Sequence, residues 1–197
     1  GIDDSCIKNE NGSIKIMLKI EDAPKGIKNS EQAYSIKVIN NSINVTGFGT
    51  LGLYYGVLTL KQCLKPEKNV LKLPCMEIFD WPDLKTRGHF MESRYGSNLM
   101  TVDDWKYLVD YMSNMKMNQL VISVYGCWCV QYDGRVSEYL YVPIKKYPKL
   151  KTPVVIRYYS PKEGRWIHEE QLPPIFAQDF FGEIIKYGKT KGVTVFP

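Results

Sequence analysis

The chain has few of the side chains on which metal sites and proton-transfer catalysis usually depend. Its two histidines, His89 and His168, lie far apart, and an isolated histidine is more often structural than catalytic. The five cysteines are odd in number, and Cys127 and Cys129 form only a C-x-C pair with no histidine at ligand spacing. We therefore expect no zinc or other metal, no cofactor, and free or buried thiols rather than a disulfide framework.

Long apolar runs and clustered charge are also missing. No apolar stretch approaches the length of about 20 residues that a transmembrane helix needs, and the N-terminal GIDDSC is not a signal peptide. The net charge of +5 is spread along the chain as single lysines. These features exclude a membrane span and argue against nucleic acid as a partner, because that would need a clustered basic surface.

What remains is the balance of a globular protein large enough to bury a core. Apolar residues make up 44% and charged residues 24% of the 197 residues. We expect a bacterial source, and we expect the sequons at Asn11, Asn40 and Asn44 to be chance occurrences in a chain this rich in Lys, Asn and Ile. The compartment stays open among secreted, periplasmic and cytoplasmic.

Residues 1–75 have the pattern of a small α+β domain. SIKIMLKI (13–20) and the segments on either side of Asn40-Asn41 alternate apolar and polar residues, as half-buried strands do. Asparagine tolerates the positive φ of a tight hairpin turn. The segment 51–64 is too long and too apolar for a strand, and predicts a helix packed on the sheet.

Residues 87–197 change to a parallel α/β pattern, after a predicted linker at 76–86 that contains Pro82. TRGHFMES predicts a short strand, and a capping box of Thr101 and Asp104 begins a helix. MNQLVISVYG predicts a strand buried on both faces. A second helix follows, with a predicted apolar face at Phe181, Ile184 and Ile185, and VTVFP begins a third strand.

The segment 127–172 is unusually long for a connection, since most take about 2–6 residues. It is rich in tyrosine and tryptophan. We expect it to fold on itself with VVIRYYS as a short strand, and we expect the tyrosines from Tyr132 to Tyr159 to form its core.

Four stretches resemble family 20 glycoside hydrolases, the β-N-acetylhexosaminidases. GLYYGVLTLKQ is similar to the G-x-x-Y/F-G-x-x-T-L-x-Q pattern of the family's non-catalytic N-terminal domain, and IFDWPDLKTRG to its junction, I-x-D-x-P-x-x-x-x-R-G. SRY resembles the S-R-H after the first barrel strand, and MKMNQL the Y-K-x-N-x-L before the second. The likeness covers roughly residues 13–126.

The resemblance implies an α+β domain followed by the first part of a (β/α)8 barrel, with the active site at the C-terminal ends of its strands. The implied activity is exo-cleavage of terminal amino sugars from glycans, in carbohydrate metabolism and glycan degradation. In the family the substrate's own acetamido group is the nucleophile, and an Asp-Glu pair after strand 4 assists it. That pair would lie beyond residue 197, so we expect no catalytic residue here and no hydrolysis by this piece alone.

Four residues form the predicted substrate-binding set: Arg94, Glu92, Trp128 and Tyr125. Arg94 matches the family arginine that binds sugar hydroxyls, for which its planar fork of donors is suited; a structural ion pair is the alternative. Glu92 would share a strand face with Arg94 and support it. The two aromatic residues would stack on sugar rings or pack within the loop. Arg87, at the start of the strand, is predicted to form a structural ion pair with Asp80 or Asp83.

Departures from the family pattern leave alternatives open. Gly126 and Cys127 stand where the family has a pair of aspartates after strand 2. The alternatives are another exo-glycosidase of the same plan, such as a family 84 hexosaminidase or an α-glucuronidase, and a carbohydrate-binding protein without turnover. A glycan is the expected partner, and an open barrel edge at Val193–Phe196 would allow self-association.

Overall fold

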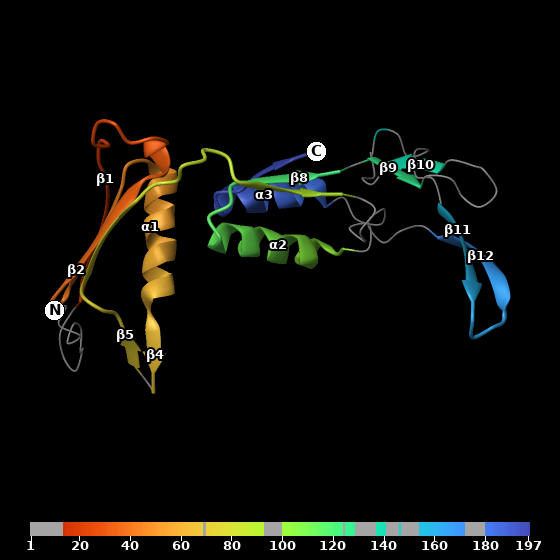
Figure 1. Ribbon diagram of the computed structural model, residues 1–197, viewed down its shortest axis with the longest axis horizontal. Coiled ribbons are helices and arrows are strands. Elements are labelled where there is room, and N and C mark those ends of the chain that lie inside the picture. Colours follow the sequence, from red (N-terminus) through yellow and green to blue (C-terminus); the bar gives the residue numbers. More distant parts are fainter. Residues whose placement is uncertain are drawn as a thin grey trace. The chain divides into compact units, whose positions relative to one another are not determined.

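The computed structural model describes residues 14–68, 70–92, 100–123, 125–128, 137–140, 146, 154–171 and 180–197, some of them by their backbone only. The chain divides into two compact units, Gly1–Lys85 and Thr86–Pro197, and each is described by itself (Figure 1). Within these ranges, no helix is long and apolar enough to cross a membrane.

The first unit contains a four-stranded sheet with the order β1-β3-β2-β6. β2 (Tyr34–Ile39) and β3 (Ser42–Gly47) form the predicted antiparallel hairpin, which turns at Asn41 with a φ of 55°. β1 (Lys15–Ile20) pairs in parallel with β3, and α1 (Thr50–Cys63) is the predicted helix. The short elements are η1 (Ser30–Gln32), β4 (Lys65–Glu67) and β5 (Val70–Lys72).

The fourth strand, β6 (Met76–Asp80), corrects the linker predicted at 76–86. It pairs antiparallel with β2 along its whole length. MEIFD alternates in exposure as a half-buried strand does. Pro74 and Pro82 flank this strand and leave its ladder intact, so they do not mark a break in the sheet.

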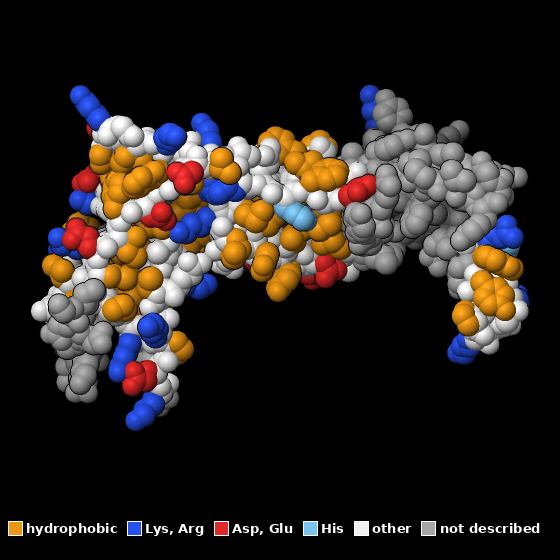
Figure 2. All heavy atoms as spheres, viewed as in Figure 1, with side chains coloured by type: hydrophobic (Ala, Val, Ile, Leu, Met, Phe, Trp, Pro, Cys, Tyr) orange, Lys and Arg blue, Asp and Glu red, His pale blue; other side chains and the backbone are white. Residues whose placement is uncertain are grey.

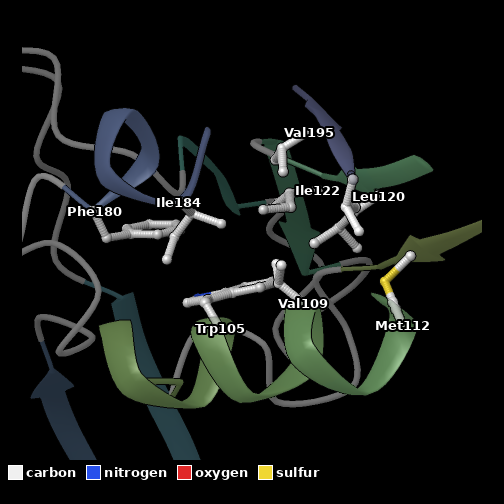
Figure 3. Packing of buried hydrophobic residues seen from close by; sticks show 9 residues of the cluster. Trp105, Val109, Met112, Leu120, Ile122, Phe180, Ile184 and Val195 are labelled. Carbon is white, nitrogen blue, oxygen red and sulfur yellow. The ribbon is translucent and has the colours of Figure 1, made fainter. Parts of the chain in front are cut away.

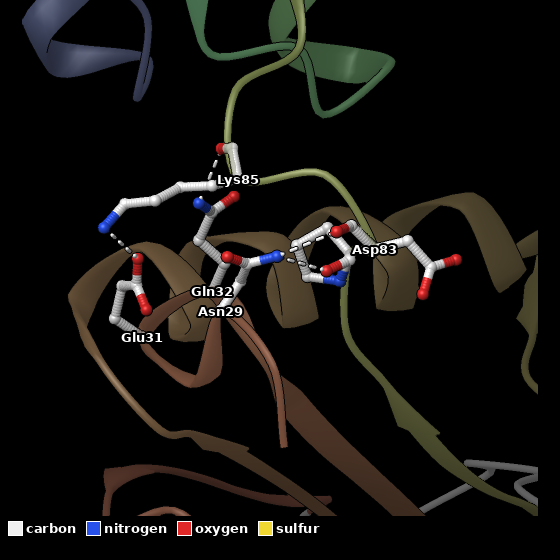
Figure 4. A network of polar contacts seen from close by, with 6 residues as sticks. Asn29, Glu31, Gln32, Asp83 and Lys85 are labelled. Atoms are coloured by element: carbon white, nitrogen blue, oxygen red, sulfur yellow. Dashed lines mark hydrogen bonds and ion pairs between the residues drawn. The ribbon is translucent and has the colours of Figure 1, made fainter. Parts of the chain in front are cut away.

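The segment that follows β6 is bound back to the first unit by side chains of the η1 region (Figure 4). Asn29 donates from Nδ2 to the carbonyls of Pro82 and Asp83 at 2.8 and 3.2 Å. The buried Gln32 donates from Nε2 to the carbonyl of Lys85 at 2.8 Å. The stretch that joins the two units is therefore ordered as far as Lys85.

α1 packs on the sheet at very short range because glycines face the strands. A Cβ on Gly52 would lie 2.1 Å from the carbonyl oxygen of Ala33, and one on Gly56 would lie 2.7 Å from Cγ1 of Val45. This approach closes a core whose buried members are Tyr34, Ile36, Val38, Ile43, Val45, Tyr55, Leu58 and Leu73.

Tyr34 links this core to two polar partners. Its hydroxyl donates to Oδ2 of Asp80 at 2.5 Å and lies 2.8 Å from Oγ1 of Thr59. Burial, followed by the hydrogen bond to Asp80, raises the pKa of Tyr34. The interaction joins β2, β6 and α1.

The expectation of free thiols is wrong at Cys75, which is in a disulfide. Cys63 is free, so the partner is a cysteine whose side chain lies outside the described part of the chain.

The second unit contains three parallel strands, β7 (Gly88–Met91), β8 (Gln119–Ile122) and β13 (Thr194–Phe196), in the order β13-β8-β7. α2 (Val102–Asn114) joins β7 to β8, and α3 (Phe181–Thr190) precedes β13. The predicted parallel pairing is confirmed. Both helices lie on the same face of this sheet and enclose a core with it (Figure 3).

The predicted cap of α2 is confirmed, and the helix buries one apolar face. Thr101 and Asp104 form both hydrogen bonds of the capping box, and Trp105, Val109 and Met112 are buried. The predicted face of α3 is wrong at Ile185, which is 40% exposed. The helix is rotated so that Gly188 faces β13, where a Cβ would lie 2.6 Å from the carbonyl of Val193.

The opposite face of this sheet carries exposed apolar side chains. Phe90 and Phe196 both stand in register with Val121, and they are 58% and 40% exposed. The space-filling view shows hydrophobic side chains exposed over both units (Figure 2). The prediction that β8 is buried on both faces is therefore wrong for this chain, because no described element covers this side.

Two hairpins form part of the long connection between β8 and α3. β9 (Tyr125–Trp128) pairs with β10 (Ser137–Leu140), and β11 (Val154–Ser160) pairs with β12 (Arg165–Gln171), both antiparallel. β11 is the strand predicted from VVIRYYS. The described parts of the segment fold on themselves as two ribbons.

The contact between α1 and the sheet can be tested with matched glycine substitutions. Gly52→Ala should lower the free energy of unfolding by about 1–3 kcal/mol, since the new methyl group would overlap the Ala33 carbonyl. Gly182→Ala is the control, because nothing lies within 4 Å of its Cβ position in α3; it should stabilise by about 0.5–1 kcal/mol. Denaturant unfolding measures both. Equal effects would contradict the close approach.

The Tyr34 interaction predicts a specific alkaline destabilisation. The folded-state pKa is raised above the unfolded value of about 10. The neutral hydroxyl therefore contributes its full stability below pH 10, and this contribution is lost as the pH rises above that value. Tyr34→Phe should lower the free energy of unfolding at pH 7 by about 1–3 kcal/mol, since the hydrogen bond to Asp80 is lost. It should also reduce the loss of stability above pH 10.

Urea unfolding at pH 7 and at several values above pH 10 measures both effects. Tyr107→Phe is the control, because Tyr107 is 74% exposed. If Tyr34→Phe kept the wild-type stability and the wild-type alkaline slope, the hydroxyl would have no structural role.

Candidate functional site

The candidate site begins where the parallel strands of the second unit end. The backbone N–H of Ser123, just after β8, donates to the carbonyl of Met91 at 3.0 Å. Glu92 and Ser123 therefore leave the sheet side by side. Alternation along β7 places Glu92 on the face of Phe90, away from α2 and α3, where its side chain is half-buried.

Of the predicted set, the structure places the side chain of Glu92 only. Arg94 lies outside the described residues. Tyr125 and Trp128 are described by their backbone, as the first and last residues of β9. That the four residues share one cleft stays a prediction.

The residues that depart from the family pattern after the second barrel strand lie in β9. Gly126 and Cys127 pair with Tyr139 and Glu138 of β10. The positions where the resemblance would put carboxylates therefore belong to a short antiparallel ribbon. Among the described residues, no group of histidine, cysteine, aspartate or glutamate could hold a metal ion.

Arg87 makes structural hydrogen bonds at the start of β7. Its Nε and Nη2 donate to the carbonyl of Lys116 at 2.9 and 2.7 Å. Lys116 has a φ of 55° and follows the last turn of α2, where carbonyls lack partners within the helix. An additional ion pair of Arg87 with Asp80 or Asp83 stays a prediction. Arg87 thus stabilises the return from α2 at the N-terminal end of the strands.

The β11–β12 hairpin presents polar and aromatic side chains that the sequence analysis missed. Tyr159 and Trp166 stand opposite each other, 50% and 47% exposed, with ring centroids 5.7 Å apart. The guanidinium carbon of Arg157 lies 5.1 Å from the centroid of Trp166. Tyr159 was predicted to be loop core and is exposed. The signal was available, because RYYS and RWIH flank the turn PKEG.

Known proteins resemble the chain over most of its length. A β-hexosaminidase of Porphyromonas gingivalis is 26% identical over 174 residues, which cover 85% of this chain and 20% of that protein. The chain spans about a fifth to a quarter of the length of the curated relatives it matches.

Solved structures agree on the fold. A glycoside hydrolase family 20 β-N-acetylglucosaminidase superposes with a TM-score of 0.66 at 21% identity, over 93% of this chain and 32% of that one. The family 20 exo-β-N-acetylglucosaminidase of Vibrio harveyi, solved in complex with N-acetylglucosamine, gives 0.64 at 19% identity, over 92% and 26%.

The family comparison locates the first unit. Residues 1–81 match domain 2 of glycosyl hydrolase family 20. This range contains the whole sheet and α1, and it ends just after β6. The first unit therefore matches family 20 domain 2, and the chain resembles family 20 β-N-acetylhexosaminidases in structure over most of its length.

Proposed function

We propose that this chain is part of a β-N-acetylhexosaminidase. The complete enzyme would release terminal N-acetylhexosamine residues from glycans by a substrate-assisted, retaining mechanism. The observation that carries the proposal is the order of elements: a family 20 domain 2 is followed directly by parallel strands joined through helices.

Two features support the start of a (β/α)8 barrel at residue 87. The strands β7, β8 and β13 are neighbours in chain order, with both helices on one side, as in a barrel wall. On the other side, Phe90, Val121 and Phe196 form one row across the three strands. A closed barrel would bury such a row as one interior layer.

The sugar site follows from the strand ends. Glu92 is on the interior side of this proposed wall, and Arg94 is two residues further along the chain. Arg94 would donate to hydroxyls of the terminal sugar, and Glu92 would orient the guanidinium or bind a hydroxyl itself. Tyr125 and Trp128 would supply aromatic surface. The general acid would come from an Asp-Glu pair outside residues 1–197.

A second candidate is favoured by one observation. The ribbon β9–β10 holds Gly126 and Cys127 where a sugar-binding aspartate would be expected. An exo-glycosidase of the same plan with another sugar specificity, or a carbohydrate-binding protein without turnover, fits this departure. Paired carboxylates after strand 4 in the complete sequence would favour the enzyme.

Arg94 and Arg87 should respond oppositely to substitution in the full-length protein. Arg94→Ala should lower kcat/KM on a chromogenic N-acetylglucosaminide about ten- to hundredfold, the effect of losing one or two charged hydrogen bonds. The melting temperature should change little. Arg87→Ala should lower the melting temperature, because the Lys116 carbonyl loses its donor.

Steady-state kinetics and calorimetry on both variants separate the two roles. Arg87→Lys, which keeps the charge without the planar fork, should recover only part of the lost stability. An Arg94→Ala enzyme with normal kinetics and a lowered melting temperature would assign Arg94 to the structural ion pair instead.

The 197 residues alone should hydrolyse nothing. A barrel gathers catalytic groups from several strand ends, and three parallel strands supply too few of them. Purified 1–197 can be assayed with chromogenic N-acetylglucosaminide, N-acetylgalactosaminide and glucuronide. Turnover that Glu92→Gln abolishes would make Glu92 catalytic and contradict its supporting role. Sedimentation of the same sample tests self-association through the β13 edge.

A further inference from the structure

The β11–β12 hairpin has one outward face that neither the fold nor the proposed sugar site uses. Its register places Tyr159 opposite Trp166 and Arg157 opposite His168, so strand alternation puts all four on the same side. All four side chains are exposed. Ile167, on the other side, is half-buried. We define the outer hairpin face as Arg157, Tyr159, Trp166 and His168.

The aromatic pair on this face forms a notch. The ring planes of Tyr159 and Trp166 are 70° apart, with the edge of one against the other. Each ring is still about half exposed, at 50% and 47%. Rings at this angle offer one flat surface and one adjoining wall. The flat C–H side of a pyranose fits such a surface, because it is apolar and rigid.

Arg157 adds a positive charge beside the notch. Its guanidinium is held over Trp166 at 5.1 Å, and no described carboxylate pairs with it. The tip carries two more basic residues, Lys162 and Arg165, and one acidic residue, Glu163, which pairs with Arg165 at 2.7 Å. This outer part of the hairpin therefore has excess positive charge. A guanidinium is suited to bind a carboxylate or a sulfate through two parallel hydrogen bonds.

Chain connectivity relates this face to the strand ends. The hairpin lies in the connection that leaves the C-terminal end of β8 and returns at α3. In an α/β barrel such connections line the active-site side.

We propose that the outer hairpin face binds the sugar on the leaving-group side of the scissile bond, and that it selects a sugar carrying a carboxylate or a sulfate. Trp166 and Tyr159 stack on the pyranose, and Arg157 binds the anionic group. This inference rests on the proposed function, since it names the second sugar of that enzyme's substrate.

The test compares two trisaccharides with the full-length protein. Both end in N-acetylglucosamine: in the hyaluronan trisaccharide the second sugar is a glucuronate, and in chitotriose it is neutral. Wild type should have the higher kcat/KM on the uronate. Arg157→Ala should lower that value roughly tenfold, through KM, and should change chitotriose less. For Arg157→Lys, kcat/KM on the uronate trisaccharide should lie between the values of wild type and Arg157→Ala. Trp166→Ala should raise KM for both trisaccharides. Tyr107→Ala, the exposed aromatic control on α2, should leave kcat/KM unchanged for both.

Several outcomes overturn the proposal. One is a wild-type preference for chitotriose, and another is an Arg157→Ala effect that is equal on both trisaccharides. A third is a Trp166→Ala variant in which only the association state changes, because the outer hairpin face would then bind a second copy of the chain. If wild type cleaves neither trisaccharide, the proposed function fails, and calorimetric binding decides the inference. Binding of the uronate trisaccharide that is lost in Arg157→Ala supports it, and no binding by wild type overturns it.

Discussion

The register of the three parallel strands depends on one residue, Asn118, at their N-terminal ends. Its side-chain oxygen accepts from the backbone N–H of Arg87 at 2.9 Å, and its own N–H donates to the Arg87 carbonyl at 2.8 Å. Its carbonyl accepts from Thr194 at 2.9 Å. A slip of one residue would turn every side chain to the other face. The placement of Glu92 at the opposite end of the strands therefore depends on these contacts. They also explain why an asparagine is needed in the MKMNQL stretch.

The first unit reaches its rigidity by a different route. Its helix carries glycines where it meets the strands, so backbone approaches backbone and few large side chains are needed between them. The same sheet gains β6, and the residues after β6 are held by Asn29 and Gln32. The carbonyl of Lys85 accepts from Gln32. Two residues later, Arg87 is hydrogen-bonded to Asn118 and Lys116. Hydrogen bonds therefore hold the backbone on both sides of Thr86.

The sequence predicted the features that depend on neighbouring residues. The turn at Asn41, the capping box of α2 and the parallel pairing of β7 with β8 follow from local pattern, and all are confirmed. β6 was missed because its prolines suggested a linker, while its strand character depends on pairing with the distant β2. The burial of β8 and the face of α3 depend on tertiary contacts that periodicity does not specify. For the candidate site, the position of Glu92 at a strand end was predicted correctly and its role in binding stays a prediction, whereas Tyr159 was wrongly assigned to a core.

The wrong prediction that Tyr159 is buried in a loop core has a physical origin, and it bears on how the hairpin could bind a ligand. An aromatic residue in a long connection can be buried or can face solvent, and composition is the same in both cases. Pairing across the PKEG turn decides it, because Tyr159 must then share a face with Trp166 and with Arg157. Such a face exposes much apolar area on a two-stranded ribbon, which is marginally stable by itself in water. An exposed aromatic pair contributes little to folding there, so its exposure is better explained by binding than by stability.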